Sequence, residues 1–160
     1  MTTTMQKLEV KPTWTMSQVQ HEVAMMKAQM CFTTSSVVEK FGKEAMTELN
    51  NKMTEMKIGY FTKLGVKTPM DLVKAMAEYE VNLLGSTIEV FGTDTEASLT
   101  FKTCAGWEAT KKMMNPTPAQ EQEMMARMTS YIETMGKHFG FTGTTKFEGE
   151  GLTITFTDYS

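Results

Sequence analysis

The sequence predicts a single α+β domain, in which an antiparallel sheet of about four strands, formed by two hairpins, packs against several amphipathic helices. Apolar residues recur every three or four positions through most of the chain, which is typical of amphipathic helices. Residues 87–103 and the last twenty residues alternate apolar and polar side chains instead, which predicts strands with one buried face. A length of 160 residues suits one domain. We expect a tail at residues 1–13 and the domain at residues 14–160.

The composition excludes several classes of protein. Hydrophobic residues make up 41% and charged residues 22%, as in globular chains. The net charge is −3 and no basic block is present, which argues against nucleic-acid binding. No apolar run approaches the roughly 20 residues of a membrane span, and no signal peptide is evident. Two cysteines without a CxxC pattern predict reduced thiols in a cytoplasmic protein.

The first helix is predicted to begin at Thr15 or Ser17, since either hydroxyl can cap a helix. The apolar stripe that follows has spacings of three and four and is expected to be buried; it consists of Met16, Val19, Val23, Met26 and Met30. Hydroxyl side chains at 33–36 compete for the backbone, so we expect a break or bend there. A short helix then ends near Gly42.

Residues 43–64 form the clearest predicted helix. Its expected buried stripe consists of Met46, Leu49, Met53, Met56, Tyr60 and Leu64. Gly65 is the expected C-terminal glycine. Thr68, followed by a proline and by Asp71, is the pattern of a helix start, and Gly85 ends that helix.

A hairpin is predicted next, with strands at 87–91 and 97–103. Residues 106–114 are expected to form a short helix. Thr117, again followed by a proline, starts a further helix that ends at Gly140. The last twenty residues form the second hairpin, and the two hairpins are expected to join into one sheet, because a lone hairpin is only marginally stable.

Cys104 is the candidate catalytic residue. It lies at the end of a predicted strand and shortly before Gly106, where the N-terminus of a helix would favour the thiolate. A nucleophilic cysteine usually also needs a base, most often histidine, and neither His21 nor His138 can be assigned to Cys104 from the sequence. A buried structural cysteine is the alternative interpretation.

Four further residues are candidate ligand-binding residues: Tyr60, Tyr79, Trp107 and His21. The aromatic rings could form pocket walls, although core packing is their default role. His21 lies off the methionine stripe, on a helix face that also carries Ala24, Met25 and Ala28. Small residues on that face allow either a pocket or close helix packing. No metal site and no cofactor are predicted, because the chain lacks the spacings of metal-ligating and nucleotide-binding motifs.

Four signals together carry a family resemblance: Val-Glu-Lys-Phe-Gly-Lys-Glu-Ala at 38–45, Glu-Leu-Asn at 48–50, Leu-Gly-Val at 64–66, and a cysteine ending the second strand of the hairpin. Over about residues 20–158 the chain resembles the loosely defined bacterial and archaeal family named after L-2-amino-thiazoline-4-carboxylic acid hydrolase. The resemblance implies hydrolytic opening of a thiazoline ring, with Cys104 as the matching cysteine. Ala105 departs from the proline of many relatives, and a second cysteine expected near 113–116 is absent.

The sequence is compatible with three functions. The first is a small-molecule-binding domain, in which some of the seventeen methionines line an adaptable pocket for a small apolar or cyclic ligand. The alternative is a hydrolase that acts on a small cyclic amidine or thiazoline-type substrate through Cys104. The third is a structural homo-oligomer that associates through an exposed methionine stripe.

Overall fold

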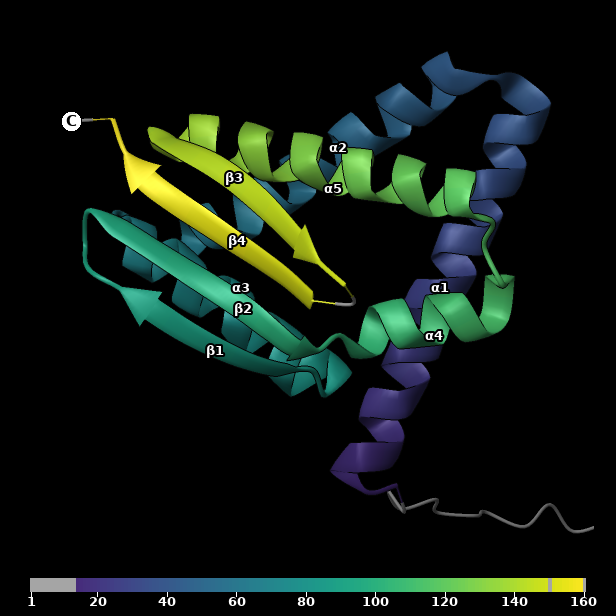
Figure 1. Cartoon of the computed structure of the whole chain (residues 1–160), viewed down its shortest axis with the longest axis horizontal. Helices are drawn as coiled ribbons and strands as arrows, with labels where there is room; N and C mark the ends of the chain where they lie inside the picture. The colour runs from purple at the N-terminus through teal and green to yellow at the C-terminus, as the bar shows by residue number, and fades with distance from the viewer. Residues whose placement is uncertain (1–13, 150, 160) are drawn as a thin grey trace, which may run out of the picture.

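The computed structural model describes residues 14–149 and 151–159, so the predicted tail at 1–13 lies outside the described residues. The helices in this part are α1 (Met16–Phe41), α2 (Lys43–Lys63), α3 (Pro69–Leu84), α4 (Ala105–Met114) and α5 (Pro118–Phe139). The strands are β1 (Thr87–Gly92), β2 (Glu96–Thr103), β3 (Phe141–Glu148) and β4 (Gly151–Asp158). All strand pairs are antiparallel, and the strand order is β1-β2-β4-β3 (Figure 1). The predicted α+β domain with two joined hairpins is confirmed.

Local sequence signals set most helix ends. Capping boxes start α1 at Thr15, α3 at Thr68 and α5 at Thr117; in each box the threonine side chain accepts a backbone N–H three residues later. Gly85 and Gly140 end α3 and α5 in the left-handed conformation. These boundaries match the predicted ones because they depend on neighbouring residues alone.

The predicted break at residues 33–36 is wrong, since α1 runs through it without interruption. Each hydroxyl donates a hydrogen bond to the carbonyl four residues earlier, for example Thr33 Oγ1 to Gln29 O at 2.9 Å and Ser35 Oγ to Cys31 O at 3.0 Å. The hydroxyl side chains therefore find their hydrogen-bond acceptors within a continuous helix.

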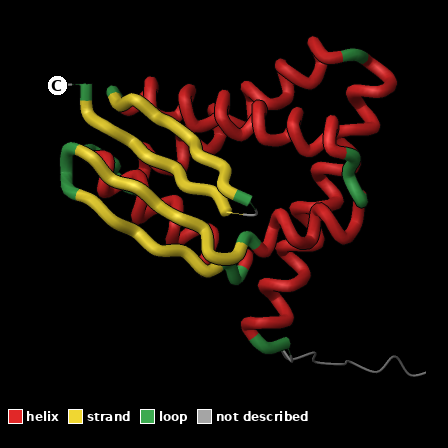
Figure 2. Tube along the Cα trace, in the orientation of Figure 1, coloured by secondary structure: helices red, strands yellow, loops and turns green. Residues whose placement is uncertain are grey.

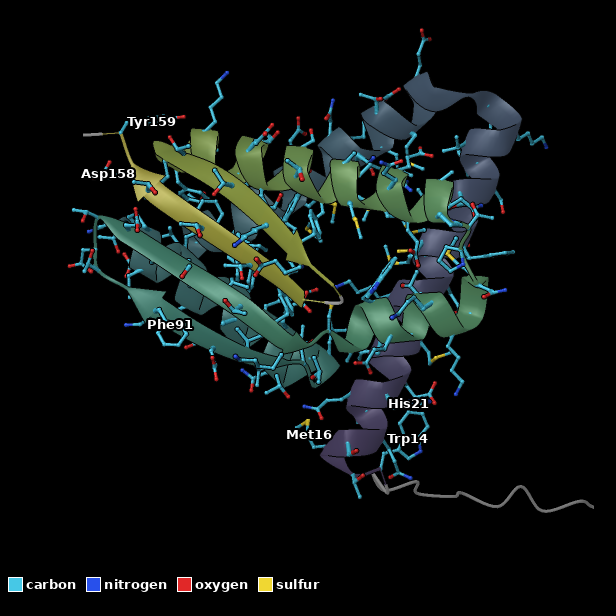
Figure 3. The ribbon with its side chains drawn as sticks, viewed as in Figure 1. Trp14, Met16, His21, Phe91, Asp158 and Tyr159 are labelled. Atoms are coloured by element: carbon cyan, nitrogen blue, oxygen red, sulfur yellow. The ribbon has the colours of Figure 1, made fainter. Side chains whose placement is uncertain are left out.

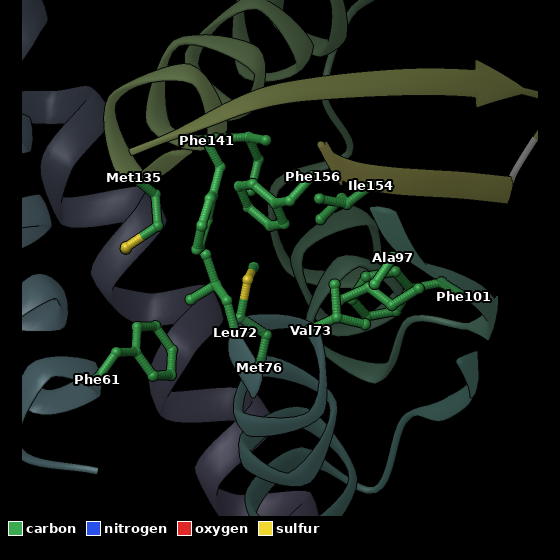
Figure 4. Close-up of a cluster of buried hydrophobic side chains, with 12 residues drawn as sticks. Phe61, Leu72, Val73, Met76, Ala97, Phe101, Met135, Phe141, Ile154 and Phe156 are labelled. Atoms are coloured by element: carbon green, nitrogen blue, oxygen red, sulfur yellow. The ribbon is translucent and has the colours of Figure 1, made fainter. Parts of the chain in front are cut away.

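Helices α3 and α5 cover one face of the sheet, while α1 and α4 pack against each other beside it (Figure 1, Figure 2). The core lies between the covered face of the sheet and helices α3 and α5 (Figure 4). Its fully buried side chains come from α3, α5 and the two central strands: Leu72, Val73, Leu99, Ile132, Met135, Ile154 and Phe156. The hairpin that leads to Cys104 is thus part of the core sheet.

The opposite face of the sheet, toward the viewer in Figure 1, is not covered by any helix of the described chain. Threonines dominate it: Thr100 of β2 pairs with Thr153 of β4, and their hydroxyl oxygens lie 3.0 Å apart. Thr155 and Thr157 continue the same row on β4. The bare face is therefore polar and β-branched.

The two methionine stripes are exposed, which corrects the prediction that they are buried. On α1 the exposed fractions are 68% for Met16, 61% for Met26 and 55% for Met30. On α2, Met46 is buried, but the later stripe residues Met53, Met56, Tyr60 and Leu64 are exposed. The helices bury other faces instead: Ala24 and Ala28 on α1, Thr54 and Phe61 on α2. Periodicity detected the stripes but not which face of each helix meets the core.

Candidate functional site

Cys104 lies where β2 turns into α4 and is the N-cap residue of that helix, with φ −115° and ψ 91°. The predicted position at a helix N-terminus is confirmed. Its side chain is partly buried against the core and makes no capping hydrogen bond. The thiol is therefore close to the positive end of α4, where the nearest backbone donor is the N–H of Trp107.

Burial raises the pKa of the Cys104 thiol above its ordinary value. The backbone N–H of Trp107 and the Lys27 ammonium act in the opposite direction, while Glu80 and Glu108 add to the increase. Because burial outweighs these two contacts, the surroundings of the thiol disfavour the thiolate. Neither histidine forms a hydrogen bond to it within the described residues. Among the described residues, no histidine is thus paired with the thiol as a base.

An ion pair lies beside Cys104: Lys27 Nζ on α1 is 3.0 Å from Glu80 Oε1 on α3. Glu80 keeps only 17% of its side chain exposed and also accepts a hydrogen bond from Ser86 Oγ at 3.4 Å. Ser86 Oγ in turn accepts the backbone N–H of Ala105 at 3.2 Å. This chain of contacts ties α1 and α3 to the first turn of α4.

The Lys27 side chain lies across Gly106 of α4. A β-carbon at Gly106 would lie 3.0 Å from Lys27 Cδ and 3.1 Å from Nζ, so the glycine makes room for the lysine. Burial opposes the charge on Lys27, but Glu80 more than offsets this and raises the lysine pKa above its usual value. Lys27 is accordingly a cation that is paired with Glu80 and interacts electrostatically with the thiol.

Tyr131 of α5 belongs to the same region. Burial, followed by the negative charge of Glu80 and by Tyr79, raises its pKa far above the ordinary value. Its hydroxyl therefore remains protonated throughout the pH range in which the protein is handled. Sequence reasoning missed Lys27, Ser86 and Tyr131 as site residues; the available signal was a charged residue, Glu80, inside the apolar stripe of α3.

A surface hollow of about 330 Å³ lies between α1 and α4, at the C-terminal end of α3. Its lining comes from one face of α1, one face of α4 and the end of α3: Ser17, Gln20, His21, Ala24, Met25, Leu84, Gly85, Ala105, Glu108, Ala109 and Lys112. The face of His21, Ala24 and Met25 is the one singled out from the sequence as able to form a pocket. Cys104 immediately precedes the lining residue Ala105.

A second hollow of about 440 Å³ adjoins the first and is lined by Trp14, Ser17, Gln18, His21 and Glu22. Figure 3 shows Trp14 and His21 on the same side of the N-terminal end of α1, with Met16 on the other side. His21 lines both hollows, so its imidazole lies on the boundary between them.

The aromatic candidates are not brought together with His21. Tyr60 and Tyr79 meet edge to face with ring centroids 6.1 Å apart, and Lys57 Nζ lies 3.2 Å from the centre of the Tyr79 ring. Trp107 is half-buried on α4, with Lys111 Nζ 6.0 Å from its ring. None of the three lines either hollow. The structure thus separates the tyrosine pair from the α1–α4 region that holds His21.

No group of three His, Cys, Asp or Glu side chains that could hold a metal ion occurs in residues 14–149 and 151–159. The described helices also include none that is long and apolar enough to cross a membrane.

Comparison with protein-family models finds no match, and no curated protein is significantly similar in sequence. Among solved structures, the chain is similar to the crystal structure of a mutant Fe(II) unliganded H-NOX protein from K. algicida. The sequence identity is 10%, the alignment covers 93% of this chain and 76% of that chain, and the TM-score is 0.32. A similarity at this level assigns neither a fold nor a ligand to the present protein. The resemblance to the thiazoline hydrolase family stays a prediction.

Proposed function

We propose that the protein is a small-molecule-binding domain whose ligand occupies the hollow between α1 and α4. The observation that carries the proposal is the separation of apolar and polar groups in the lining. Ala24 and Leu84 are buried and form the apolar floor, while His21, Glu108 and Lys112 are exposed on the rim. Pockets that bind small molecules combine an apolar body with a few polar groups in this way.

The lining suits a small ligand with an apolar, ring-sized body and one polar or charged end. The alanines of α1 and α4 leave room for the body, because larger side chains at these positions would fill the hollow. The rim offers a cation at Lys112, an anion at Glu108 and, at His21, an imidazole that can donate or accept a hydrogen bond. Met25 is the methionine of this lining. A methionine-rich pocket stays an untested prediction.

The proposal is tested by backbone NMR of ¹⁵N-labelled protein titrated with a panel of small cyclic carboxylates and amines. We expect saturable shifts of the amide signals of His21, Ala24, Ala105 and Ala109 with at least one compound class. Ala109→Leu should abolish these shifts, because its side chain would occupy the hollow.

Ala126→Leu is the matched control, since Ala126 is exposed in the middle of α5 and lies outside the hollow. The control should bind like the natural chain. Shifts that persist in Ala109→Leu, or a panel in which no compound perturbs these four amides, would contradict the proposal. Native mass spectrometry of the freshly purified protein adds an independent search for a retained ligand.

Hydrolysis of a cyclic amidine or thiazoline-type substrate through Cys104 is the second candidate. The Lys27 ammonium near the thiol favours it, since a nearby cation stabilises the thiolate. Burial acts against it by raising the thiol pKa. The rate of Cys104 alkylation by iodoacetamide as a function of pH, followed by peptide mass spectrometry to separate it from Cys31, decides. A thiol pKa at or above the ordinary value rules out a thiolate nucleophile.

The prediction of a cytoplasmic location also stays a proposal. Both cysteines, Cys31 and Cys104, are free thiols, as expected of a reducing compartment. Fractionation of the native host with antibody detection would test it, and recovery of the protein outside the cytoplasm would overturn it.

A further inference from the structure

One side of α1 is an apolar stripe without a partner in the described chain. Met16, Val19, Met26 and Met30 are 68%, 40%, 61% and 55% exposed, and Val23 between them is half-buried. The packing face of α1 lies elsewhere, at Ala24 and Ala28. Exposed apolar surface of this extent on one helix marks an interaction surface.

The spacing of the stripe is that of a coiled coil. Successive residues are three, four, three and four positions apart, so they occupy the a and d positions of two heptads and the a position of a third. From Met16 to Met30 the stripe extends about 21 Å along the helix. A repeat of 3.5 residues keeps such a seam facing a second helix along its whole length.

We propose that two copies of the chain pair through parallel α1 helices along this stripe. In that arrangement the residues that flank the seam are Glu22 on one side and Lys27 on the other, at g and e positions. Glu22 of each copy then faces Lys27 of the second copy, which gives two symmetric pairs of opposite charge. Lys27 is bonded to Glu80 at 3.0 Å but keeps 42% of its side chain exposed, so in the dimer its ammonium would be shared between Glu80 and Glu22 of the second copy.

The exposed stripe on α2 does not offer the same match. The corresponding parallel pairing would place Lys52 of one copy opposite Lys57 of the other, and like charges at these positions repel. Charge complementarity therefore favours α1 as the self-association helix.

The same charges argue against a lipid surface as the occupant. Interfacial helices carry several lysines or arginines on their polar face, whereas α1 contains only Lys27 and Lys40. The chain as a whole has a net charge of −3, which disfavours anionic membranes. His21 projects from the side of α1 opposite Met16, so a dimer leaves the α1–α4 hollow open (Figure 3). The seam and the hollow thus lie on different sides of α1, with Gln20 between them.

The test is sedimentation equilibrium of the full chain and of Met26→Glu. We expect a dimer for the natural chain and a dissociation constant raised about a hundredfold or more by Met26→Glu, because two like charges would meet in the seam. Met56→Glu is the matched control, since Met56 is 76% exposed on α2 and lies outside the proposed seam. It should leave the dimer unchanged. Circular dichroism of both variants is the check that they are folded.

Val19→Cys tests the parallel register, because the two d positions of a parallel pair face each other. Mild oxidation should link two copies through Cys at position 19, whereas Gln18→Cys, on another face of α1, should give no such product. A monomer at all concentrations, a dimer that survives Met26→Glu, or a dimer in which Val19→Cys does not cross-link overturns the proposal. A monomer that instead sediments with anionic phospholipid vesicles would assign the stripe to a membrane surface.

Discussion

Replacing Gly143 with alanine should destabilise the protein by about 2 kcal/mol. Gly143 of β3 lies where α5 comes closest to the sheet: its β-carbon would collide with the carbonyl oxygen of Ile132 and lie 3.0 Å from Phe156 Cε1. Overpacking a core costs about 1–3 kcal/mol, and replacing a strand glycine by alanine returns roughly 0.5–1 kcal/mol. We expect the cost of overpacking to lie in the upper part of its range, because the colliding atom belongs to the backbone of α5. Relief of the collision requires α5 to move away from the sheet.

Equilibrium urea unfolding followed by circular dichroism measures the change. Gly59→Ala is the matched control, because a β-carbon at Gly59 of α2 would meet nothing within 4 Å. The control should stabilise the protein by about 0.5–1 kcal/mol, since alanine is the better helix former. The same substitution thus has opposite signs at the two positions. A Gly143→Ala free energy of unfolding within about 0.5 kcal/mol of the natural chain would refute the close approach of α5 to β3.

Three further predictions concern the core and two titrating groups. Leu72→Ala removes a fully buried side chain and should lower the free energy of unfolding by about 3–5 kcal/mol in the same urea assay; a loss below about 2 would show that the site collapses. Hydrogen bonds from the backbone N–H of Lys67, and then from Thr68, hold the pKa of the Asp71 carboxyl below its ordinary value. Because the native pKa lies below that of the unfolded chain, this stabilisation is complete above about pH 4 and is lost as the pH falls through the native pKa. Asp71→Asn should therefore flatten the acid limb of the stability profile, and an unchanged limb would exclude the cap. Glu80→Gln should lower the pKa of the Cys104 thiol, because Glu80 contributes to its increase; a slower alkylation rate at fixed pH would contradict the assigned contacts.

Much of the fold could be predicted because its signals are local. The threonine caps at Thr68 and Thr117 and the glycines at 85 and 140 act through residues within one helical turn, so sequence alone locates them. Alternation along the strands likewise identifies the covered face of the sheet before the sheet is assembled. The same reasoning failed for the hydroxyl residues 33–36 of α1. Hydroxyls that bond to helix carbonyls and hydroxyls that disrupt a helix give the same sequence pattern.

The candidate site was predictable in part. His21, Ala24 and Met25 share a helix face, and that face does line a hollow. The ion pair of Lys27 with Glu80 joins residues 53 positions apart, and no local sequence pattern identifies such a distant partner. Sequence reasoning offered close helix packing as one role for the face with Ala24 and Ala28, but it could not rank this face above the methionine stripe, because the helix has two apolar faces. The face with alanines meets the domain, since α3 and α4 can approach small side chains closely.

The threonine row allows one face of the sheet to stay uncovered, so that the domain consists of one layer of helices and one sheet. Threonine has the branched shape that strands favour, so Thr100, Thr153 and Thr155 support the sheet as valines would. The hydroxyl oxygens of Thr100 and Thr153 lie 3.0 Å apart, and hydroxyls on an uncovered face can hydrogen-bond water, so this face offers little apolar surface to other molecules. Valine at these three positions would preserve the strands and turn the face into a sticky apolar surface prone to aggregation. We therefore expect the choice of threonine over valine on this face to limit aggregation while still supporting the strands.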